Sequence, residues 1–281
     1  MITSKTQKIG ILGWPLGHSL SPIMHNAAFK SLHLDYVYIP LPVHPENLAQ
    51  AVAGLKAMEF TGVNVTIPHK VEIMSYLDEI DFSAQLVGAV NTVAIKDGKS
   101  IGYNTDAQGF VQSILSNGIK ITEQTAVILG AGGAARAVAC GLFQHGIKKI
   151  IIGARNLEKA QQFVKLFSTN VDIQAYDWED SGFQNLLQEC DILINSTPIG
   201  MSVNDTEVLP IPWETLNPEA AVCDLIYNPS KTQLLLSAEE HGNIAINGLG
   251  MLIEQGALAF ELWTGEKGPR QIMSDALTEY L

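Results

Sequence analysis

Positive charge is scarce in this sequence. Its 17 lysines and arginines stand against 29 aspartates and glutamates, which gives a formal net charge of -12 at pH 7. A surface that binds nucleic acid or an anionic membrane needs a cluster of basic side chains. We therefore expect no nucleic-acid partner and no membrane partner, and any anionic ligand must be held by groups gathered locally.

Cysteine is also rare, and long apolar runs are missing. The three cysteines, Cys140, Cys190 and Cys223, are far apart and lie in apolar segments, so they fit neither a disulfide framework nor a zinc site. No apolar run approaches the ~18 residues of a membrane span, and the N-terminal segment has no apolar core of signal-peptide length. These absences predict buried, reduced thiols, no metal and a cytoplasmic protein.

Apolar residues are plentiful. They make up 47% of the 281 residues, whereas charged residues make up 16%. This balance is typical of a globular protein, and the length suits two domains of ordinary size or one large domain.

The second half of the chain alternates apolar, β-rich runs with helix-like segments. Six such runs begin at residue 125: TAVILG, KKIIIGAR, VDIQAYDW, DILINST, AAVCDLIY and NIAING. Alternating strands and helices imply a parallel sheet covered on both faces. The series predicts a doubly wound, Rossmann-type α/β domain.

A glycine-rich turn follows the first of these strands. Gly130, Gly132 and Gly133 precede an alanine-rich helix, and glycines in that position allow a pyrophosphate to approach the helix N-terminus. The next strand ends in Arg155 instead of an acid, and Lys159 follows one helical turn later. Two cations there favour the 2′-phosphate of NADP over NAD, unless both are simply solvated.

The first half also alternates strand and helix, and its stretch GVNVTIPHK (62–70) carries an unusual lysine. Strand alternation places three apolar side chains on one face, Val63, Val65 and Ile67, and two polar ones on the other, Asn64 and Thr66. Pro68 should end the strand and place Lys70 in the first turn of a helix. A helix N-terminus disfavours a cation, so Lys70 is either chemically active or merely solvated.

Asp97-Gly98 predicts a tight turn between two strands of the first half.

Two further features suggest how the two halves join. Asp106 begins a long helix, where an N-cap or a dipole-favoured acid would also explain it. Two C-terminal amphipathic helices have no further strand to cover, so we expect them to return to the first half. The predicted domains are a substrate-binding domain, 1–105 completed by 252–281, and a dinucleotide domain, 106–251, with a cleft between them.

Seven motifs occur in order along nearly the whole chain. They are GHSLSP (17–22), NVTIPHK (64–70), GAVNT (88–92), NTD (104–106), GAGGAAR (130–136), NSTPIGM (195–201) and GMLIEQGALAFELWTG (250–265). Together they resemble the shikimate dehydrogenase family. The resemblance implies a reversible, NADPH-dependent reduction of 3-dehydroshikimate to shikimate in aromatic amino-acid biosynthesis.

The resemblance also implies roles for residues of the first half. Lys70 and Asp106 would be the catalytic pair, with the lysine managing the proton that accompanies hydride transfer. Ser19 and Ser21 would bind the substrate carboxylate, although Ser21 before Pro22 could instead be a helix N-cap. The substrate hydroxyls would be bound by Asn64, Thr66, Asn91 and Gln255, with Tyr227 closing the ring of contacts. His18 and His69 are expected to pack beside these motifs.

The cofactor residues implied by the resemblance lie in the second half. The pyrophosphate would meet Gly130, Ala131, Gly132, Gly133 and Ala134. The 2′-phosphate end would meet Arg155, Asn156 and Lys159, and the nicotinamide half would meet Thr197, Leu225, Gly248 and Met251. The family often has Asn-Arg-Thr where this chain has Ala154, Arg155 and Asn156, which leaves the strictness of the NADP preference open.

Other functions share this fold. A quinate/shikimate dehydrogenase with broader substrate or NAD use would be favoured by an acid in place of Arg155. A catalytically silent, dinucleotide-sensing regulator is disfavoured because Lys70 and Asp106 are both present. A methylenetetrahydrofolate dehydrogenase has the same two-domain outline, but HSLSP gives no sign of a pterin site. The sequence leaves monomer and homodimer open.

Overall fold

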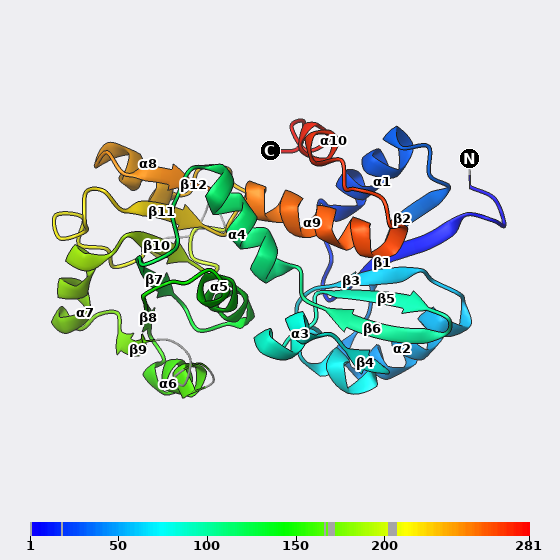
Figure 1. The fold of residues 1–281 in the computed structure, drawn as a ribbon, viewed down its shortest axis with the longest axis horizontal. Helices are drawn as coiled ribbons and strands as arrows, with labels where there is room; N and C mark the ends of the chain where they lie inside the picture. Colours follow the sequence, from blue (N-terminus) through cyan, green and yellow to red (C-terminus); the bar gives the residue numbers. More distant parts are fainter. Residues whose placement is uncertain (1, 18, 166, 168–171, 202–206) are drawn as a thin grey trace. The chain divides into compact units, whose positions relative to one another are not determined.

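The computed structural model describes residues 2–17, 19–165, 167, 172–201 and 207–281 (Figure 1). Contacts divide the chain into two compact units. Unit 1 is Met1–Gly109 with Ile253–Tyr280, and unit 2 is Phe110–Leu252 with Leu281. The domain limits drawn from the sequence, and the roles given to those ranges, stay predictions.

Unit 1 is built on a mixed sheet with the strand order β2-β1-β3-β5-β6-β4. Its strands are β1 (Gln7–Gly13), β2 (Tyr36–Pro42), β3 (Gly62–Val65), β4 (Glu79–Ile80), β5 (Thr92–Lys96) and β6 (Lys99–Tyr103). Its helices include α1 (Ser21–Ser31), α2 (Leu48–Ala57), α3 (Phe82–Val87) and α10 (Arg270–Asp275), with the 3-10 turns η1 (Pro45–Asn47) and η2 (Glu72–Tyr76). Along the chain, α4 (Asp106–Ser116) and α9 (Leu249–Thr264) each run from one unit into the other.

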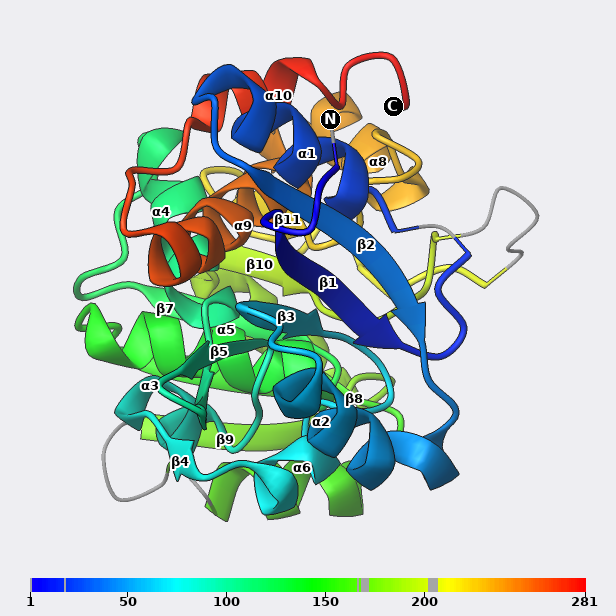
Figure 2. The same ribbon diagram turned by 90° about the vertical axis from the view of Figure 1, so that its right-hand side faces the viewer.

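The two faces of β3 have different neighbours. Val63 and Val65 are buried in one cluster with Leu48, Val52 and Leu55 of α2, which confirms the apolar alternation for these two valines. Asn64 points to the opposite face. Figure 2 shows β1 and β2 side by side with α1 and α10 near one another, and contacts join α1 to both α10 and β2.

The prediction for Ile67 is wrong, because β3 ends at Val65. Ile67 is 74% exposed, and its carbonyl accepts a hydrogen bond from Trp14 N. Once the chain leaves the sheet, alternation no longer decides which way a side chain points. The strand therefore delivers only Val63 and Val65 to the core.

The C-terminal helices return to unit 1. Trp263 of α9 donates its indole N–H to the Val93 carbonyl at 3.0 Å. Gly62 permits this approach, because a Cβ there would lie 2.4 Å from Trp263 Nε1 and 2.3 Å from Val93 O. The predicted hairpin is confirmed nearby: Asp97 and Gly98 have φ of 51° and 75° between β5 and β6, as a two-residue turn requires.

Unit 2 contains an all-parallel sheet with the order β12-β11-β10-β7-β8-β9. Its strands are β7 (Thr125–Leu129), β8 (Lys149–Ala154), β9 (Asp172–Asp177), β10 (Ile192–Asn195), β11 (Ala221–Asp224) and β12 (Ile244–Ile246). Its helices include α5 (Gly133–Gln144), α6 (Leu157–Lys165), α7 (Ser181–Leu186) and α8 (Gln233–Glu240), with the 3-10 turn η3 (Leu187–Glu189). This is the strand order of a Rossmann domain, so the predicted doubly wound fold is confirmed.

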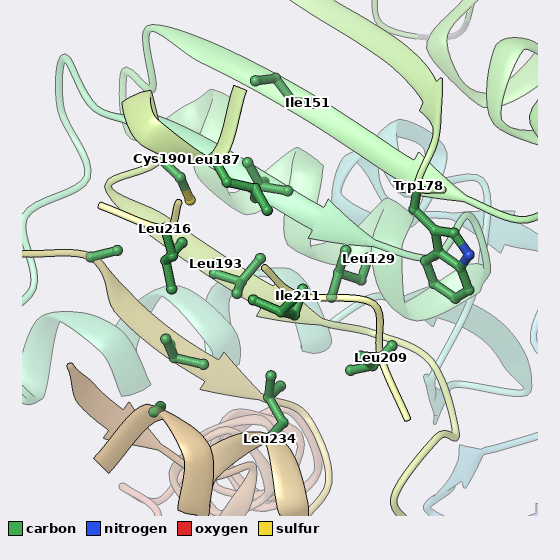
Figure 3. Packing of buried hydrophobic residues seen from close by; sticks show 14 of the residues in the cluster. Leu129, Ile151, Trp178, Leu187, Cys190, Leu193, Leu209, Ile211, Leu216 and Leu234 are labelled. Carbon is green, nitrogen blue, oxygen red and sulfur yellow. The ribbon is translucent and has the colours of Figure 1, made fainter. Parts of the chain in front are cut away.

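The buried strands of unit 2 read as continuous apolar runs because both faces of a parallel sheet are covered. Figure 3 shows part of the core, in which Leu129, Ile151 and Leu193 come from three neighbouring strands. Among the described residues, the cysteines Cys140, Cys190 and Cys223 are buried and form no disulfide, and burial raises the pKa of all three thiols. Among the described helices, none combines the length and apolar character needed to cross a membrane.

Candidate active site

Lys70 and Asp106 form an ion pair in unit 1. Lys70 Nζ donates to Asp106 Oδ2 at 2.7 Å, and the two side chains are 28% and 12% exposed. Lys70 lies in a turn two residues before η2, so its predicted place in the first turn of a helix is wrong. Backbone bonds from His69 N to Thr66 O and from Val90 N to Lys70 O hold this turn. The ammonium therefore remains accessible while its position is fixed.

Asp106 is held from its other oxygen. Asn91 Nδ2 donates to Asp106 Oδ1 at 2.8 Å and to Thr105 Oγ1 at 2.9 Å. Asp106 is not an N-cap, because Asn104 Oδ1 accepts from the Asp106 and Ala107 backbone N–H groups in that role. As the first residue of α4, Asp106 places its carboxylate where the helix dipole favours negative charge.

A buried tyrosine extends this polar network. Tyr38 OH donates to Asn64 Oδ1 at 2.7 Å, and Asn64 Nδ2 donates to Asn91 O at 3.2 Å and to Thr92 Oγ1 at 3.1 Å. Burial raises the pKa of Tyr38 far above its ordinary value, partly offset by a hydrogen bond with the Ser21 side chain. Hydrogen bonds thus run continuously from Ser21 through Tyr38, Asn64 and Asn91 to Asp106.

The two serines lie at the start of α1, and the N-cap alternative concerned Ser21 alone. Helix α1 begins at Ser21 itself, its N-cap is Leu20, and no side chain caps it, so the N-cap alternative for Ser21 is wrong. Its buried hydroxyl is directed to Tyr38 instead. Ser19 Oγ accepts a long bond of 3.4 Å from Ser21 N. Both side chains thus lie at the start of α1.

Histidines support the network without forming part of the ion pair. His25 is fully buried and stacks on Tyr38, with ring centroids 4.6 Å apart and planes 9° apart. His69 Nε2 donates to Val43 O at 2.7 Å and so anchors the turn that carries Lys70, in keeping with its predicted packing role. His18 lies outside the described residues.

Gln255 and Thr66 both belong to unit 1 and lie on different elements. A Cβ on Gly109 would lie 2.8 Å from the Gln255 backbone N and Cβ, so a glycine there lets α4 and α9 meet closely. Gly109 follows Asp106 by three residues and therefore lies on the same helix face. Thr66 is half-buried directly after β3, where its N–H donates to Leu12 O at 2.8 Å.

The glycine loop of unit 2 fits a pyrophosphate. Gly130 has φ of 102°, and a Cβ there would lie 2.8 Å from Ser196 Oγ. At Gly132 and Gly133 a Cβ would meet open space, so the backbone there is accessible. Gly132 is the N-cap of α5 and has no side chain to cover the first N–H groups. Ala131 and Ala134 complete a loop of small residues.

A buried carboxylate positions the neighbouring loops of unit 2. Asp224 accepts from Thr232 Oγ1 at 2.7 Å and from Asn195 Nδ2 at 3.0 Å, and burial raises its pKa against these bonds. Asn195 Oδ1 in turn accepts from the Thr197 backbone N–H at 2.9 Å and from Thr197 Oγ1 at 2.7 Å. Thr197 is thereby fixed after β10, beside β7 at the switch point of the sheet.

The remaining predicted cofactor residues also belong to unit 2. A Cβ on Gly248 would lie 2.1 Å from Leu225 O, so these two backbones touch at the ends of β11 and β12. Met251 lies in the first turn of α9 and is partly exposed. Tyr227, which was predicted to contact the substrate, also follows β11 in unit 2. It is half-buried, and burial raises its pKa.

Arg155 stands at the carboxyl end of β8, as predicted. It pairs with Glu207 and lies over the Trp178 ring at 5.7 Å. Asn156 Oδ1 accepts from Lys159 N at 2.9 Å and so caps α6. The side chains of Asn156 and Lys159 are exposed.

Several residues of the site were not found from the sequence. Tyr38, Asn104, Asn195, Asp224 and Glu207 hold or face the predicted groups through the contacts described above. The alternation in DYVYIP marks Tyr38 as strand-borne, but only the register across β1 brings it to Asn64. No sequence signal joins Glu207 to Arg155, which is 52 residues away.

A Rossmann sheet with an open glycine loop, together with a lysine–carboxylate pair in a second α/β unit, defines a dinucleotide-dependent oxidoreductase. Family profiles match most of the chain: the Shikimate dehydrogenase substrate binding domain at residues 11–93, Shikimate / quinate 5-dehydrogenase at 110–208, and the Shikimate 5'-dehydrogenase C-terminal domain at 248–278. The chain belongs to the shikimate dehydrogenase family.

Three relatives illustrate the similarity. Shikimate dehydrogenase (NADP(+)) of Methanocaldococcus jannaschii is 48% identical over 99% of both chains. A Listeria monocytogenes shikimate 5-dehydrogenase structure with shikimate and NAD is 39% identical, with a TM-score of 0.93 over 98% of both chains. A Thermus thermophilus structure with NADP(H) and shikimate is 35% identical, with a TM-score of 0.88 over 98% of this chain and 100% of that one.

Proposed function

We propose that this chain catalyses the reversible, NADP-dependent interconversion of shikimate and 3-dehydroshikimate. The observation that carries the proposal is the Lys70–Asp106 pair, held at 2.7 Å in the unit that contains the substrate-binding family match. The names of the relatives support the substrate and the cofactor. The reaction belongs to the shikimate pathway.

When bound, NADP(H) would supply hydride chemistry at the ring carbon that carries the reacting oxygen. In the reductive direction, negative charge develops on that oxygen. The Lys70 ammonium stabilises the charge and donates the proton, and in the oxidative direction the lysine takes it back. Asp106 orients Lys70 through Oδ2 and offers a carboxylate to a substrate hydroxyl.

The remaining groups of unit 1 would bind the ring. Both amide hydrogens of Asn64 are engaged, so Asn64 offers a substrate hydroxyl only the second lone pair of Oδ1. Asn91 already donates to Thr105 and Asp106, and binding a hydroxyl would exchange one of these bonds. Thr66 and Gln255 would bind further hydroxyls, while Ser19 and Ser21 bind the carboxylate. Tyr227, which belongs to unit 2, would bind a further hydroxyl.

Unit 2 would bind NADP. The accessible backbone from Gly130 to Ala134 suits the pyrophosphate, and Arg155 with Lys159 and Asn156 suits the adenosine phosphate. Thr197, Leu225, Gly248 and Met251 would line the nicotinamide half. We further propose a cytoplasmic location, consistent with three cysteines that form no disulfide among the described residues, and a monomer or homodimer.

A spectrophotometric assay tests this proposal directly. Shikimate and quinate are each offered with NADP and with NAD, for the wild type and for Lys70→Ala. We expect shikimate with NADP to be the preferred pair and Lys70→Ala to lower kcat at least ~100-fold, because a positioned proton donor is typically worth ~10² to 10⁴ in rate. Preference for quinate with NAD would instead establish the broader dehydrogenase.

A matched variant separates chemistry from loss of an ion pair. Lys56 pairs with Asp78 at 2.7 Å elsewhere in unit 1, and Lys56→Ala should leave kcat unchanged. Because Lys70 and Asp106 share one task, Lys70→Ala combined with Asp106→Ala should be only slightly slower than the slower single variant. A fully active Lys70→Ala enzyme would refute the assignment.

A further inference from the structure

The residue that faces Arg155 is an acid from a distant part of the chain. Arg155 Nη1 and Glu207 Oε1 form an ion pair between side chains that are 61% and 46% exposed. Arg155 also lies over Trp178, with its Cζ 5.7 Å from the ring centroid. The guanidinium therefore has an indole on one side and a carboxylate on another.

Glu207 is placed by the core beneath it. Leu209, two residues later, is buried in the same cluster as Trp178, and Figure 3 shows the two on the same side of that cluster. The Trp178 ring supports Arg155, while Leu209 anchors the segment that carries Glu207. The pair thus rests on packed residues of unit 2.

Rossmann domains select between NAD and NADP at the end of the second strand. An acid there binds the ribose 2′-hydroxyl, whereas an arginine accommodates the 2′-phosphate. In this chain the arginine directly follows strand β8, and the acid approaches it from the segment after β10. An arginine and an acid therefore lie side by side in unit 2, with the acid paired to the arginine.

We propose that Glu207 is a cofactor-specificity residue that competes with the 2′-phosphate of NADP for Arg155. The proposal rests on the proposed NADP site. To bind the phosphate through Nη1, Arg155 must give up its bond to Glu207, and a phosphate bound through the other guanidinium N–H groups lies near a carboxylate of the same charge. Glu207 therefore weakens NADP binding and leaves NAD binding unaffected by this competition.

The energetics allow the exchange. An exposed ion pair contributes little to stability, so it can be broken readily. A guanidinium–phosphate contact is charge-assisted and can be bidentate, which makes it stronger. Removing the competing carboxylate should tighten binding of a 2′-phosphate about tenfold, equivalent to ~1.4 kcal/mol.

Calorimetric titration of the full chain with two adenosine fragments tests the proposal. Adenosine 2′,5′-bisphosphate carries the phosphate, and 5′-AMP lacks it. Glu207→Gln should bind the bisphosphate about tenfold more tightly than the wild type and should bind 5′-AMP equally well. In an Arg155→Ala background the same change should tighten bisphosphate binding less than about threefold, because the contested group is gone.

Glu239→Gln is the matched control. Glu239 also belongs to unit 2, pairs with Lys231 at 2.7 Å and is 45% exposed, so its replacement changes the net charge by the same amount. It should leave binding of both fragments unchanged. Equal tightening by both glutamine variants, or the same gain with and without Arg155, would overturn the competition.

The fragments also keep the two proposals apart. Binding needs no turnover, so a chain that lacks shikimate dehydrogenase activity but shows the Glu207 effect would refute the proposed reaction alone. Unchanged or weaker bisphosphate binding by Glu207→Gln in an active enzyme would refute the competition alone. Failure of the wild type to bind either fragment would overturn the nucleotide site and the competition together.

Discussion

Protonation of His25 should destabilise unit 1. The ring is fully buried, stacks on Tyr38 and lies 5.4 Å from Trp263, and neither ring nitrogen has a hydrogen-bond partner among the described residues. Burial lowers the pKa of His25 from 6.5 to about 3, because the charged imidazolium would lose its hydration. The folded protein therefore holds the neutral ring.

The pH dependence of stability follows from the difference between the ordinary His25 pKa of 6.5 and its value of about 3 in the folded protein. Because the folded pKa is lowered, the stabilisation is fully present above about pH 6.5 and is lost as the pH falls towards about 3. The loss is ~1.4 kcal/mol per pH unit inside that window. Between about pH 7 and pH 5 it amounts to ~2 kcal/mol, a large fraction of the ~5 to 15 kcal/mol that stabilises a typical domain.

His25→Phe removes the titration and keeps an aromatic ring against Tyr38. Urea unfolding between about pH 7 and pH 5, followed through amide protection of β1 and β2, would report on unit 1 separately from unit 2. The wild type should lose ~2 kcal/mol more than His25→Phe over this range. His241 is an exposed ring stacked on Trp213 at 5.2 Å, so His241→Phe should behave as the wild type. Parallel pH profiles for the wild type and His25→Phe would refute the argument.

Three further predictions concern binding. Arg155→Ala should raise KM for NADP at least about tenfold and leave KM for NAD nearly unchanged, because only NADP carries the 2′-phosphate; equal losses would exclude the phosphate role. Ser19→Ala should raise KM for shikimate without lowering Tm, since its Oγ accepts only a 3.4 Å bond; normal KM would move the carboxylate site elsewhere. Tyr38→Phe should raise KM for shikimate several-fold and reduce stability by ~1 kcal/mol, because Asn64 Oδ1 loses its hydrogen-bond donor. KM for NADP should stay constant, and an unchanged shikimate KM would show that Tyr38 does not position Asn64.

The sequence predicted those parts of the fold that depend on residues close together in the chain, such as turns and individual strands. The glycine loop after β7 has the open backbone that its spacing indicates, and Asp97-Gly98 adopts the positive φ angles that a two-residue hairpin requires. The six apolar runs became the six parallel strands of unit 2. Such features depend on neighbours in sequence, so the sequence displays them directly.

Features that depend on register or on long-range contacts were beyond these rules. Ile67 continues the apolar alternation in the sequence. In the structure it lies in a turn after β3, where its carbonyl accepts a hydrogen bond from Trp14 N, and the alternation does not predict this turn. Tyr38 reaches Asn64 from β2 to β3 across the intervening β1, which requires the strand order as well as the alternation. The Arg155–Glu207 pair likewise needs the fold of unit 2.

The turn that carries Lys70 explains why a cation can be tolerated after β3. A helix beginning at Pro68 would have placed its positive end beside the ammonium. The observed turn instead presents Lys70 to Asp106, whose own position at the start of α4 puts a carboxylate where that helix dipole favours it. Asn91 fixes the other carboxylate oxygen, and the accessible lysine retains donors beyond the one engaged. The electrostatic cost expected from the sequence is therefore absent, and the arrangement leaves a positioned ammonium available for proton transfer.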